Sequence, residues 1–248
     1  MRVLVVSDLH SNLEGLQAVL AAAQGEYTQV VCCGDLVGYG PDPNAIVDWV
    51  RENVSAVVRG NHDKAGCGID DAEGFNEVAK AAAYWTRGQL TPENLQYLRD
   101  LPVGPLEVMG RFAILHGSPQ DEDEYITVSW EATEVFQHLV HPVSFFGHTH
   151  LQGGFFRSPD SPVQAISPPL GKGESRRVME LKASHTYYVN PGSVGQPRDG
   201  DSRAGFAIYD MAGFIEFGRT AYDLQSTANK MRQNGLPEFL AHRLSLGR

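Results

Sequence analysis

The stretch that decides the fold is RVLVVSDLH, residues 2–10. Its uninterrupted apolar run, Val3 to Val6, predicts a strand that is buried on both faces. Asp8 and His10 follow directly after this strand, at the end where open α/β sheets place their ligands. If the chain stays extended, these two side chains point the same way. An isolated pair of this kind is more often a cap or a turn than a metal site. Whether Asp8 and His10 bind a metal therefore depends on further ligand residues elsewhere in the chain.

The strand–helix alternation of this opening unit continues through the first 150 residues. It predicts a layered α/β fold, and we expect a single domain over residues 1–248. The predicted strands are Val3 to Val6, Val30 to Cys33, Ala56 to Val58, Arg111 to Leu115 and Val143 to Phe146. The predicted helices are Leu13 to Ala23 with Asn12 as N-cap, Ala45 to Glu52, Phe75 to Gly88, one opened by Thr91 and Pro92, and one capped by Ser129 and running to about Val140.

The pattern changes after His150, where β-hairpin strands replace the strand–helix units. These strands, which predict a second sheet, are Gly153 to Arg157, Thr186 to Val189, Gly205 to Asp210 and Phe214 to Gly218. The stretch Ser158 to Glu174 is rich in Pro, Gly and Ser and predicts a mobile loop. Two helices, about Leu224 to Gln233 and Pro237 to Leu246, are expected on either side of the helix stop Asn234-Gly235.

The composition narrows the class of protein. A chain of 248 residues, 42% of them hydrophobic, can bury one substantial core. The net charge of -10 argues against sequence-independent binding of nucleic acid, which needs clustered Lys and Arg. No apolar stretch reaches the roughly 20 residues that cross a bilayer, and from the strand-like run Arg2 to Val6 we expect no secretory leader. Cys32 and Cys33 are expected to pack on opposite faces of one strand, and with Cys67 they form no disulfide framework, so we expect a soluble, cytoplasmic protein.

Asp, Asn and His residues gather at the ends of all five predicted strands. The strand ends read DLH at 8–10, GD at 34–35, GNHD at 60–63, HG at 116–117 and GHTH at 147–150. Glycine in four of these blocks lets the backbone approach an ion or a phosphate without a Cβ in the way. The blocks predict a metal site, because Asp, Asn and His supply the ligands that suit Mn, Fe, Zn or Ni. The remaining histidines, His138, His141, His185 and His242, are expected to be structural or on the surface.

In this order the five blocks resemble the signature of the calcineurin-like metallophosphoesterases. The segments DLVGYGPDPN, 35–44, and NPGSVGQPRDG, 190–200, are also similar to the small prokaryotic phosphodiesterases of the YfcE type. The resemblance implies an α/β fold in which two packed mixed sheets are flanked by helices, a four-layer α-β-β-α sandwich. It also implies hydrolysis of a phosphoester, foremost a phosphodiester, at two divalent metal ions.

Carried over by position, the resemblance assigns seven metal ligands. Asp8, His10 and His150 would hold one ion, Asn61, His116 and His148 the other, and Asp35 would bridge both. A bridging carboxylate suits the spacing of about 3.5 to 4 Å that two-metal hydrolytic sites use. A hydroxide shared by the two ions would attack phosphorus in line while the ions take up the developing charge.

His62 follows a predicted ligand, and the resemblance implies that it faces the substrate instead of an ion. Because an imidazole donates a proton close to neutral pH, we expect His62 to protonate the leaving alkoxide as a general acid. The alternative is a histidine that only orients Asn61.

The second block departs from that of the family's serine/threonine protein phosphatases, GDxVDRG. Gly38 and Tyr39 stand where those enzymes have Asp and Arg, so a protein phosphatase is disfavoured. For substrate binding we predict Arg198 as the phosphate ligand, with Asn190 beside the same turn. The alternative for Arg198 is a surface salt bridge, and the alternative for Asn190 is a structural turn residue. Arg59 is expected to form a structural pair, and Tyr39 either borders the leaving-group pocket or packs.

The sequence does not determine which phosphoester is the substrate or which metal is bound. The expected partner is a small phosphoester bound at two divalent ions, for which we favour Mn and keep Fe, Zn and Ni. A dinucleoside polyphosphate hydrolase and a phosphomonoesterase are alternatives. A more distant one is a metal-binding scaffold like the retromer subunit of the same superfamily, but that subunit has an altered active-site histidine, whereas His62 is present here. The sequence carries no sign of the oligomeric state.

Overall fold

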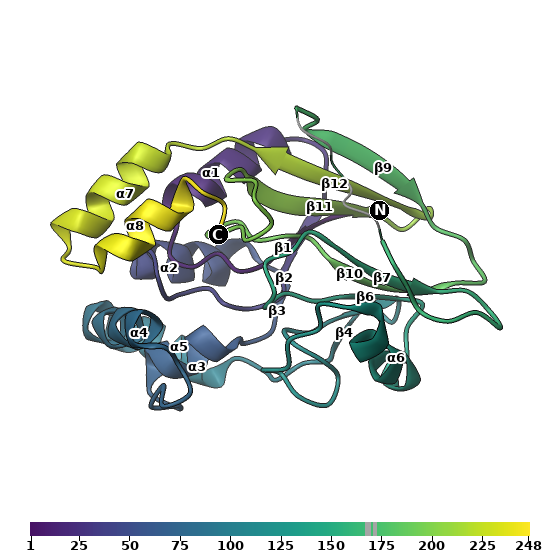
Figure 1. Cartoon of the computed structure of the whole chain (residues 1–248), viewed down its shortest axis with the longest axis horizontal. Coiled ribbons are helices and arrows are strands. Elements are labelled where there is room, and N and C mark those ends of the chain that lie inside the picture. The colour runs from purple at the N-terminus through teal and green to yellow at the C-terminus, as the bar shows by residue number, and fades with distance from the viewer. Residues whose placement is uncertain (167–169, 171–172) are drawn as a thin grey trace.

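The computed structural model describes residues 1–166, 170 and 173–248, and its strands form two six-stranded sheets (Figure 1). The first sheet has the order β3-β2-β1-β11-β12-β9 and the second the order β4-β5-β6-β10-β7-β8. The strands of the first sheet are β1 (Arg2–Val6), β2 (Gln29–Cys32), β3 (Ala56–Val57), β9 (Arg176–Glu180), β11 (Ala204–Asp210) and β12 (Phe214–Thr220). Those of the second are β4 (Leu106–Val108), β5 (Phe112–Ile114), β6 (Val143–Phe145), β7 (Gly153–Arg157), β8 (Gln164–Ala165) and β10 (Thr186–Asn190).

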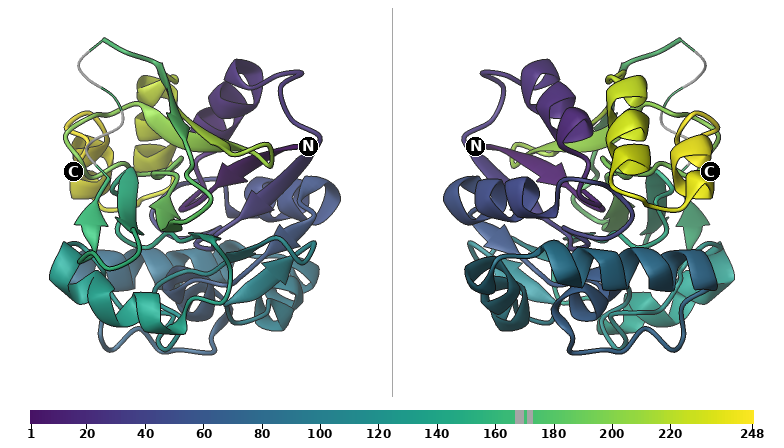
Figure 2. Two further views of the ribbon diagram at one scale, coloured as in Figure 1. Left: turned by 90° about the vertical axis from the view of Figure 1, so that its right-hand side faces the viewer. Right: turned by 90° about the vertical axis from the view of Figure 1, so that its left-hand side faces the viewer.

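The helices lie outside the pair of sheets, as both views in Figure 2 show. They are α1 (Leu13–Ala22), α2 (Pro43–Asn53), α3 (Asn61–Cys67), α4 (Glu77–Gln89), α5 (Pro92–Asp100), α6 (Ser129–His138), α7 (Leu224–Gln233) and α8 (Glu238–Leu244). Several starts follow from local chemistry. The Asn12 side chain accepts the Gly15 N–H at the start of α1, and Pro92 occupies the first turn of α5 after the N-cap Thr91.

Side-chain alternation along the strands divides the core into layers. In β1, Val3 and Val5 face the core between the sheets, whereas Leu4 and Val6 join the cluster packed under α1 and α2. A further cluster on the outer face of the second sheet contains α6 and the fully buried Tyr188. The predicted four-layer α-β-β-α sandwich is therefore confirmed.

The adjacent cysteines of β2 follow the same alternation. Cys32 belongs to the cluster under the helices, and Cys33 belongs to the core between the sheets. Both thiols are free and buried, and burial raises the pKa of Cys33 well above its ordinary value. The prediction that the two cysteines pack on opposite faces is confirmed.

The division of strands between the sheets differs from the prediction. The hairpin strands after His150 do not form a sheet of their own, because β11 pairs antiparallel with β1 and extends the first sheet. Strands β7 and β10 join the second sheet instead, where β10 runs parallel to β6. Such long-range pairing is decided by which faces are buried together and leaves little trace in the local pattern.

Three local features also differ from the sequence prediction: helix α3, the start of α6 and the predicted loop over 158–174. The GNHD block opens helix α3 at Asn61, where only a polar turn was expected. Helix α6 begins at Ser129 itself, with Val128 as its N-cap, because the Glu131 carboxylate accepts the Val128 N–H at 3.2 Å. The predicted mobile loop over 158–174 contains the short strand β8, and its residues 167–169 and 171–172 lie outside the described residues.

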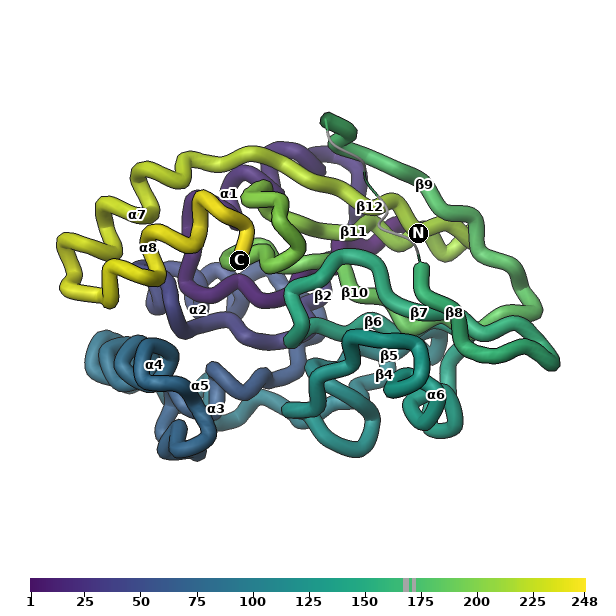
Figure 3. Tube along the Cα trace, in the orientation of Figure 1, coloured from purple at the N-terminus to yellow at the C-terminus, as the bar shows by residue number. Residues whose placement is uncertain are grey.

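The two C-terminal helices close one end of the molecule. Helices α7 and α8 lie side by side, and Figure 3 shows α8 on the side that faces α4. The cluster between them contains Leu240 and Leu244 of α8, Ala79 and Ala82 of α4, and Tyr39 from the loop after β2. None of the described helices combines the length and the apolar character that crossing a bilayer requires.

Candidate metal centre

The carboxyl ends of strands from both sheets meet at one edge and bring the predicted ligands together. Asp8, His10, Asp35 and His150 form one group whose ligand atoms all lie within 4.8 Å of one another. Asp35, His116 and His148 form a second group by the same measure, and every member of both groups is buried. One carboxylate oxygen, Asp35 Oδ2, lies 3.5 Å from His10 Nε2 and 3.4 Å from His116 Nε2. Asp35 therefore stands between the two groups, where the bridging ligand was predicted.

Asn61 completes the second group. Its Oδ1 lies 3.3 Å from His116 Nε2. As the first residue of α3, it is held in place by the helix start, where the Asp35 Oδ1 accepts the His62 N–H at 2.9 Å. All seven predicted ligands thus converge, although their assignment to individual ions stays a prediction.

One nitrogen of each clustered histidine contacts a backbone carbonyl. These contacts join His10 Nδ1 to Val37 O (2.9 Å), His150 Nδ1 to Gln196 O (2.5 Å), His116 Nδ1 to Cys33 O (2.8 Å) and His148 Nε2 to Asp123 O (2.9 Å). A nitrogen that donates to a carbonyl carries the proton, so in a neutral ring the other nitrogen presents its lone pair. This is the arrangement in which proteins orient histidine as a metal ligand.

The lone pairs of His10 and His150 face each other. Their Nε2 atoms lie 3.1 Å apart. Burial lowers the pKa of His10 to about 4 and that of His150 well below the usual range, so neither ring supplies a proton to the contact. Two lone pairs at this distance repel each other unless a cation lies near both. The buried donor set, with the carboxylates of Asp8 and Asp35, fits a divalent metal ion.

The carboxylates affect the two histidines of the second group differently. Burial lowers the pKa of His116, but the carboxylates of Asp35 and Asp8 outweigh this effect and raise it to about 10. Burial lowers the pKa of His148 to about 3, and its Nδ1 lies 3.2 Å from His116 Nε2. Because a metal ion binds the deprotonated imidazole, metal binding would compete with protonation of His116.

The backbone at the ligands is itself unusual. Asp8, His10, Asp35, His148 and His150 have φ values of 52, 44, 53, 65 and 60°, in the left-handed region that side chains other than glycine rarely adopt. The chain is therefore not extended from Asp8 to His10, so the condition for their side chains to point the same way by strand alternation is not met, although both side chains still reach the same group. Strained backbone of this kind costs free energy and is concentrated at functional sites.

Two glycines let backbone approach the centre closely. A Cβ on Gly60 would overlap Asp35 Oδ1, so this position must lack a side chain for the bridging carboxylate to keep its place. Gly38, with φ of 88°, lies against the His62 ring, and a Cβ there would be 2.5 Å from His62 Nδ1. The departure from the protein phosphatase pattern at Gly38 thus leaves His62 in contact with bare backbone.

The sequence interpretation missed Asp63, which organises the loops around the centre. Its fully buried carboxylate accepts the N–H groups of Leu36 at 2.8 Å, Val37 at 3.2 Å and Gly60 at 2.9 Å. It ties the loop after β2, which carries Asp35, to the start of α3, which carries Asn61. The available signal was its position three residues after the helix N-cap, where an acidic side chain bonds back to the cap.

His62 lies beside the centre and lines a pocket. Its ring packs against Tyr39 at 4.3 Å and Phe75 at 4.6 Å between centroids. Burial lowers its pKa well below the usual range. The buried Nδ1 has no hydrogen-bond partner among the described residues, so the imidazole is not held by a carboxylate.

The structure favours different roles for Arg198 and Asn190, the two predicted substrate-binding residues. Arg198 Nη2 lies 3.3 Å from the Tyr39 hydroxyl and 3.1 Å from Gln196 Oε1, and its buried Nε finds no partner in the described chain. Within residues 1–166, 170 and 173–248 Arg198 forms no ion pair, which argues against the surface salt bridge. Asn190 is fully buried, and its amide donates to Gly147 O at 2.8 Å and to Thr149 Oγ1 at 3.1 Å. Its geometry favours the alternative, a structural turn residue.

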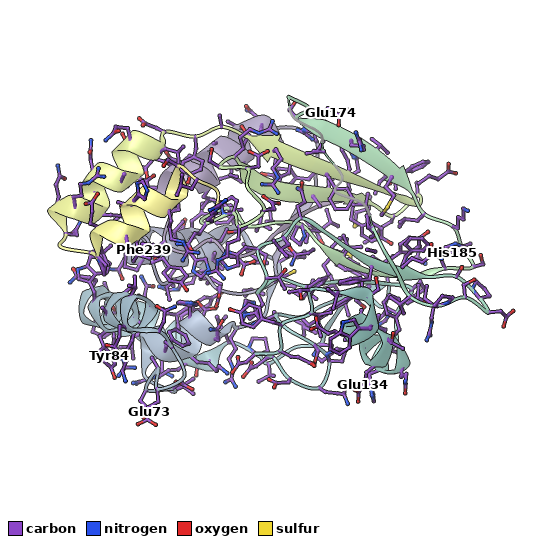
Figure 4. All side chains as sticks on the ribbon, viewed as in Figure 1. Glu73, Tyr84, Glu134, Glu174, His185 and Phe239 are labelled. Carbon is purple, nitrogen blue, oxygen red and sulfur yellow. The ribbon has the colours of Figure 1, made fainter. Side chains whose placement is uncertain are left out.

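The remaining side chains named from the sequence fall where expected. Arg59 forms a bidentate ion pair with Glu122, in which the shortest N···O distance is 2.8 Å. Tyr39 lines the pocket beside His62. His141 pairs with Glu107, and His138 and His242 are exposed. Figure 4 shows His185 at the opposite end of the molecule from Phe239 of α8.

The pocket beside the centre has a volume of about 290 Å³ and combines predicted residues with unpredicted ones. Asn61, His62 and His148 form its inner wall. The loop before α4 contributes Asp70, Gly74, Phe75 and Asn76, and the loop before α6 contributes Asp123 and Tyr125. No sequence signal marked these loop residues, because loops carry little periodic pattern.

Two packed mixed sheets with a buried Asp/His cluster at their shared edge define the class of the metal-dependent phosphoesterases. The chain belongs to the calcineurin-like phosphoesterase superfamily, whose domain model matches residues 1–213. The family that the order of the five blocks had indicated is thereby confirmed.

Individual proteins match over almost the whole chain. An uncharacterized protein of Methanocaldococcus jannaschii is 35% identical over 250 residues, which cover 98% of this chain and 97% of the relative. The crystal structure of a metallophosphoesterase from Sphaerobacter thermophilus is 38% identical, with a TM-score of 0.85 over 100% of this chain and 99% of that one. YfcE, a phosphoesterase from E. coli, matches with 20% identity and a TM-score of 0.43 over 85% of this chain and 89% of that one.

Proposed function

We propose that this protein is a dinuclear metal-dependent phosphodiesterase that acts on small phosphoesters. The observation that carries the proposal is the pair of buried ligand groups sharing Asp35, with the lone pairs of His10 and His150 only 3.1 Å apart. Such a donor set is costly to bury without cations between its members. Asp8, His10, Asp35 and His150 would hold one ion, and Asp35, Asn61, His116 and His148 the other.

Divalent ions supply two things at such a site: they lower the pKa of a water nucleophile and neutralise the phosphoryl oxygens. Manganese is our choice because carboxylate and amide oxygens suit it, and Fe, Zn and Ni are compatible because they suit the imidazole ligands. The core shared by both sheets supports treating residues 1–248 as one domain.

Two side chains of the protein would bind the phosphoryl group and protonate the leaving oxygen. The Arg198 guanidinium, oriented by Gln196 and Tyr39, would bind a non-bridging phosphoryl oxygen through its free donors. His62 would give a proton to the leaving oxygen, since it lines the pocket and does not belong to either ligand group. Because burial lowers the pKa of His62, the negative charge of a bound phosphodiester would have to raise that pKa for the ring to carry the proton.

The experiment that tests this proposal measures nitrophenol release from bis(4-nitrophenyl) phosphate and from 4-nitrophenyl phosphate with manganese. We expect the wild type to hydrolyse the diester faster than the monoester. Asp35→Asn should lose most of the activity because it weakens both ligand groups, whereas His138→Ala, an exposed histidine outside the centre, should match the wild type.

Equal rates in Asp35→Asn and wild type would overturn the metal mechanism. A faster reaction with the monoester would point to the alternative, a phosphomonoesterase. Capture of a partner protein without turnover of any phosphoester would favour the scaffold.

A further inference from the structure

We propose that the pocket beside the metal centre binds the leaving group and selects a flat, uncharged alcohol. The inference rests on the proposed phosphodiesterase function and names the part of the substrate that this function leaves open. It would rank diesters of aromatic alcohols or nucleosides above substrates whose leaving group is itself a phosphate.

The position of the pocket identifies it as the leaving-group side. Its inner wall contains Asn61 and His148 of the second ligand group, and also His62, the proposed proton donor. A proton donor must be within reach of the oxygen that departs. The group attached to that oxygen therefore extends into this pocket.

Aromatic rings line the pocket next to the reacting residues. The Phe75 ring centroid lies 4.6 Å from that of His62, and the Tyr125 ring centroid lies 3.7 Å from that of His148. Tyr39 contributes a third ring, and Tyr125 leaves 52% of its surface exposed. Exposed ring faces at a pocket favour planar ligands, because stacking needs two flat surfaces.

The charges around the pocket exclude a second anion. Asp70 and Asp123 line it, and none of its described lining residues is Lys or Arg. The Lys64 ammonium neutralises Asp123 at 2.6 Å, but Asp70 has no ion pair among the residues that the structure describes. Arg198 lies over Tyr39, 5.7 Å from its ring centroid, and does not line the pocket. Arg198 also interacts with Tyr125, so this cation lies at the rim of the pocket, whereas the side formed by the loop before α4 carries the carboxylate of Asp70.

The test uses phosphonates, whose P–C bond cannot be hydrolysed, and measures their binding to the manganese-loaded protein by calorimetry. We expect phenylphosphonate to bind at least about tenfold more tightly than methylphosphonate and at least about threefold more tightly than cyclohexylphosphonate, which has similar bulk but no flat face. We expect 4-carboxyphenylphosphonate to bind at least about fivefold more weakly than phenylphosphonate, because its second charge meets Asp70.

Two variants locate the effect in this pocket. Phe75→Leu and Tyr125→Leu keep an apolar side chain and remove the ring, so the ratio of the dissociation constants of methylphosphonate and phenylphosphonate should fall most of the way to one in both variants. Trp130→Ala, an aromatic residue of α6 that is 76% exposed and lies outside the pocket, should keep the full preference.

Equal binding of the phenyl, cyclohexyl and methyl compounds would overturn the pocket proposal alone. A preference that survives in both leucine variants would overturn it as well. If neither methylphosphonate nor inorganic phosphate bound the loaded protein, the proposed function would fail and the pocket proposal with it.

Discussion

At the scale of single residues, main-chain carbonyls orient the histidines of the centre. His10, His116 and His150 each contact a carbonyl through Nδ1, and His148 does so through Nε2. The residue types at the five strand ends were enough to predict which side chains gather. Which nitrogen of each ring faces the cluster depends on contacts between segments far apart in the chain, and the sequence does not encode those in any local pattern.

The role of His62 is tested by the dependence of its effect on the leaving group. A general acid contributes about 10² to 10⁴ in rate, and less when the leaving group departs readily without a proton. His62→Ala should therefore slow hydrolysis of diphenyl phosphate more than that of bis(4-nitrophenyl) phosphate, at unchanged manganese content. Equal losses with both esters would favour the alternative, a histidine that only orients Asn61.

The three hydrogen bonds of Asp63 give a stability prediction. Asp63→Ala leaves the N–H groups of Leu36, Val37 and Gly60 without their acceptor in a buried place. Because an unsatisfied buried donor costs about 1 to 3 kcal/mol, we expect the free energy of unfolding to fall by at least about 2 kcal/mol in urea denaturation. The control Asp100→Ala changes an exposed position, so its free energy of unfolding should stay within about 0.5 kcal/mol of the wild type. A loss that small in Asp63→Ala would contradict the role assigned to Asp63.

At the scale of elements, the prediction succeeded where the pattern is local and periodic. The strand from Val3 to Val6 and the helix after Asn12 were found because an apolar run and an N-cap lie within a few residues of each other. Helix α3 was missed because its seven residues, Asn61–Cys67, contain the polar NHD and too few apolar positions to show a period. The sharing of strands between the sheets was missed because β1 and β11 pair across some two hundred residues.

The start of α3 gives a prediction about metal content. A Cβ at residue 60 would overlap the Asp35 carboxylate, so Gly60→Ala should displace the residue shared by both ligand groups. We expect manganese per chain to fall from about two to at most about one, measured by elemental analysis. Gly88→Ala, where a Cβ on α4 meets nothing within 4 Å, is the control and should keep its metal. Full metal content in Gly60→Ala would show that the close approach does not matter.

At the scale of the whole molecule, the two C-terminal helices, α7 and α8, lie beyond residue 213, where the match to the superfamily model ends. These helices pack on α4 and on Tyr39, which borders both the pocket and Arg198. The helix stop Asn234-Gly235 helped to predict them as two separate helices, but their docking beside the centre depends on Tyr39, whose place in the fold no local pattern indicates.

The docking of α8 can be tested by a cavity. Leu240 is fully buried between α8, α4 and Tyr39, so Leu240→Ala should lower the free energy of unfolding by about 2 to 5 kcal/mol. Leu246→Ala, at a position that is 45% exposed, should cost much less. Similar stability of the two variants in urea denaturation would mean that α8 is not packed as described.

The pair of metal ions is the claim on which the proposed chemistry depends, and it can be measured directly. Wild type and Asp35→Asn are reconstituted with manganese, freed of excess metal, and analysed for manganese per chain. Because Asp35 lies between both ligand groups, we predict about two ions in the wild type and a loss at both sites in Asp35→Asn. About one ion per chain or fewer in the wild type would contradict the two-metal centre, since two-metal hydrolysis needs both sites filled.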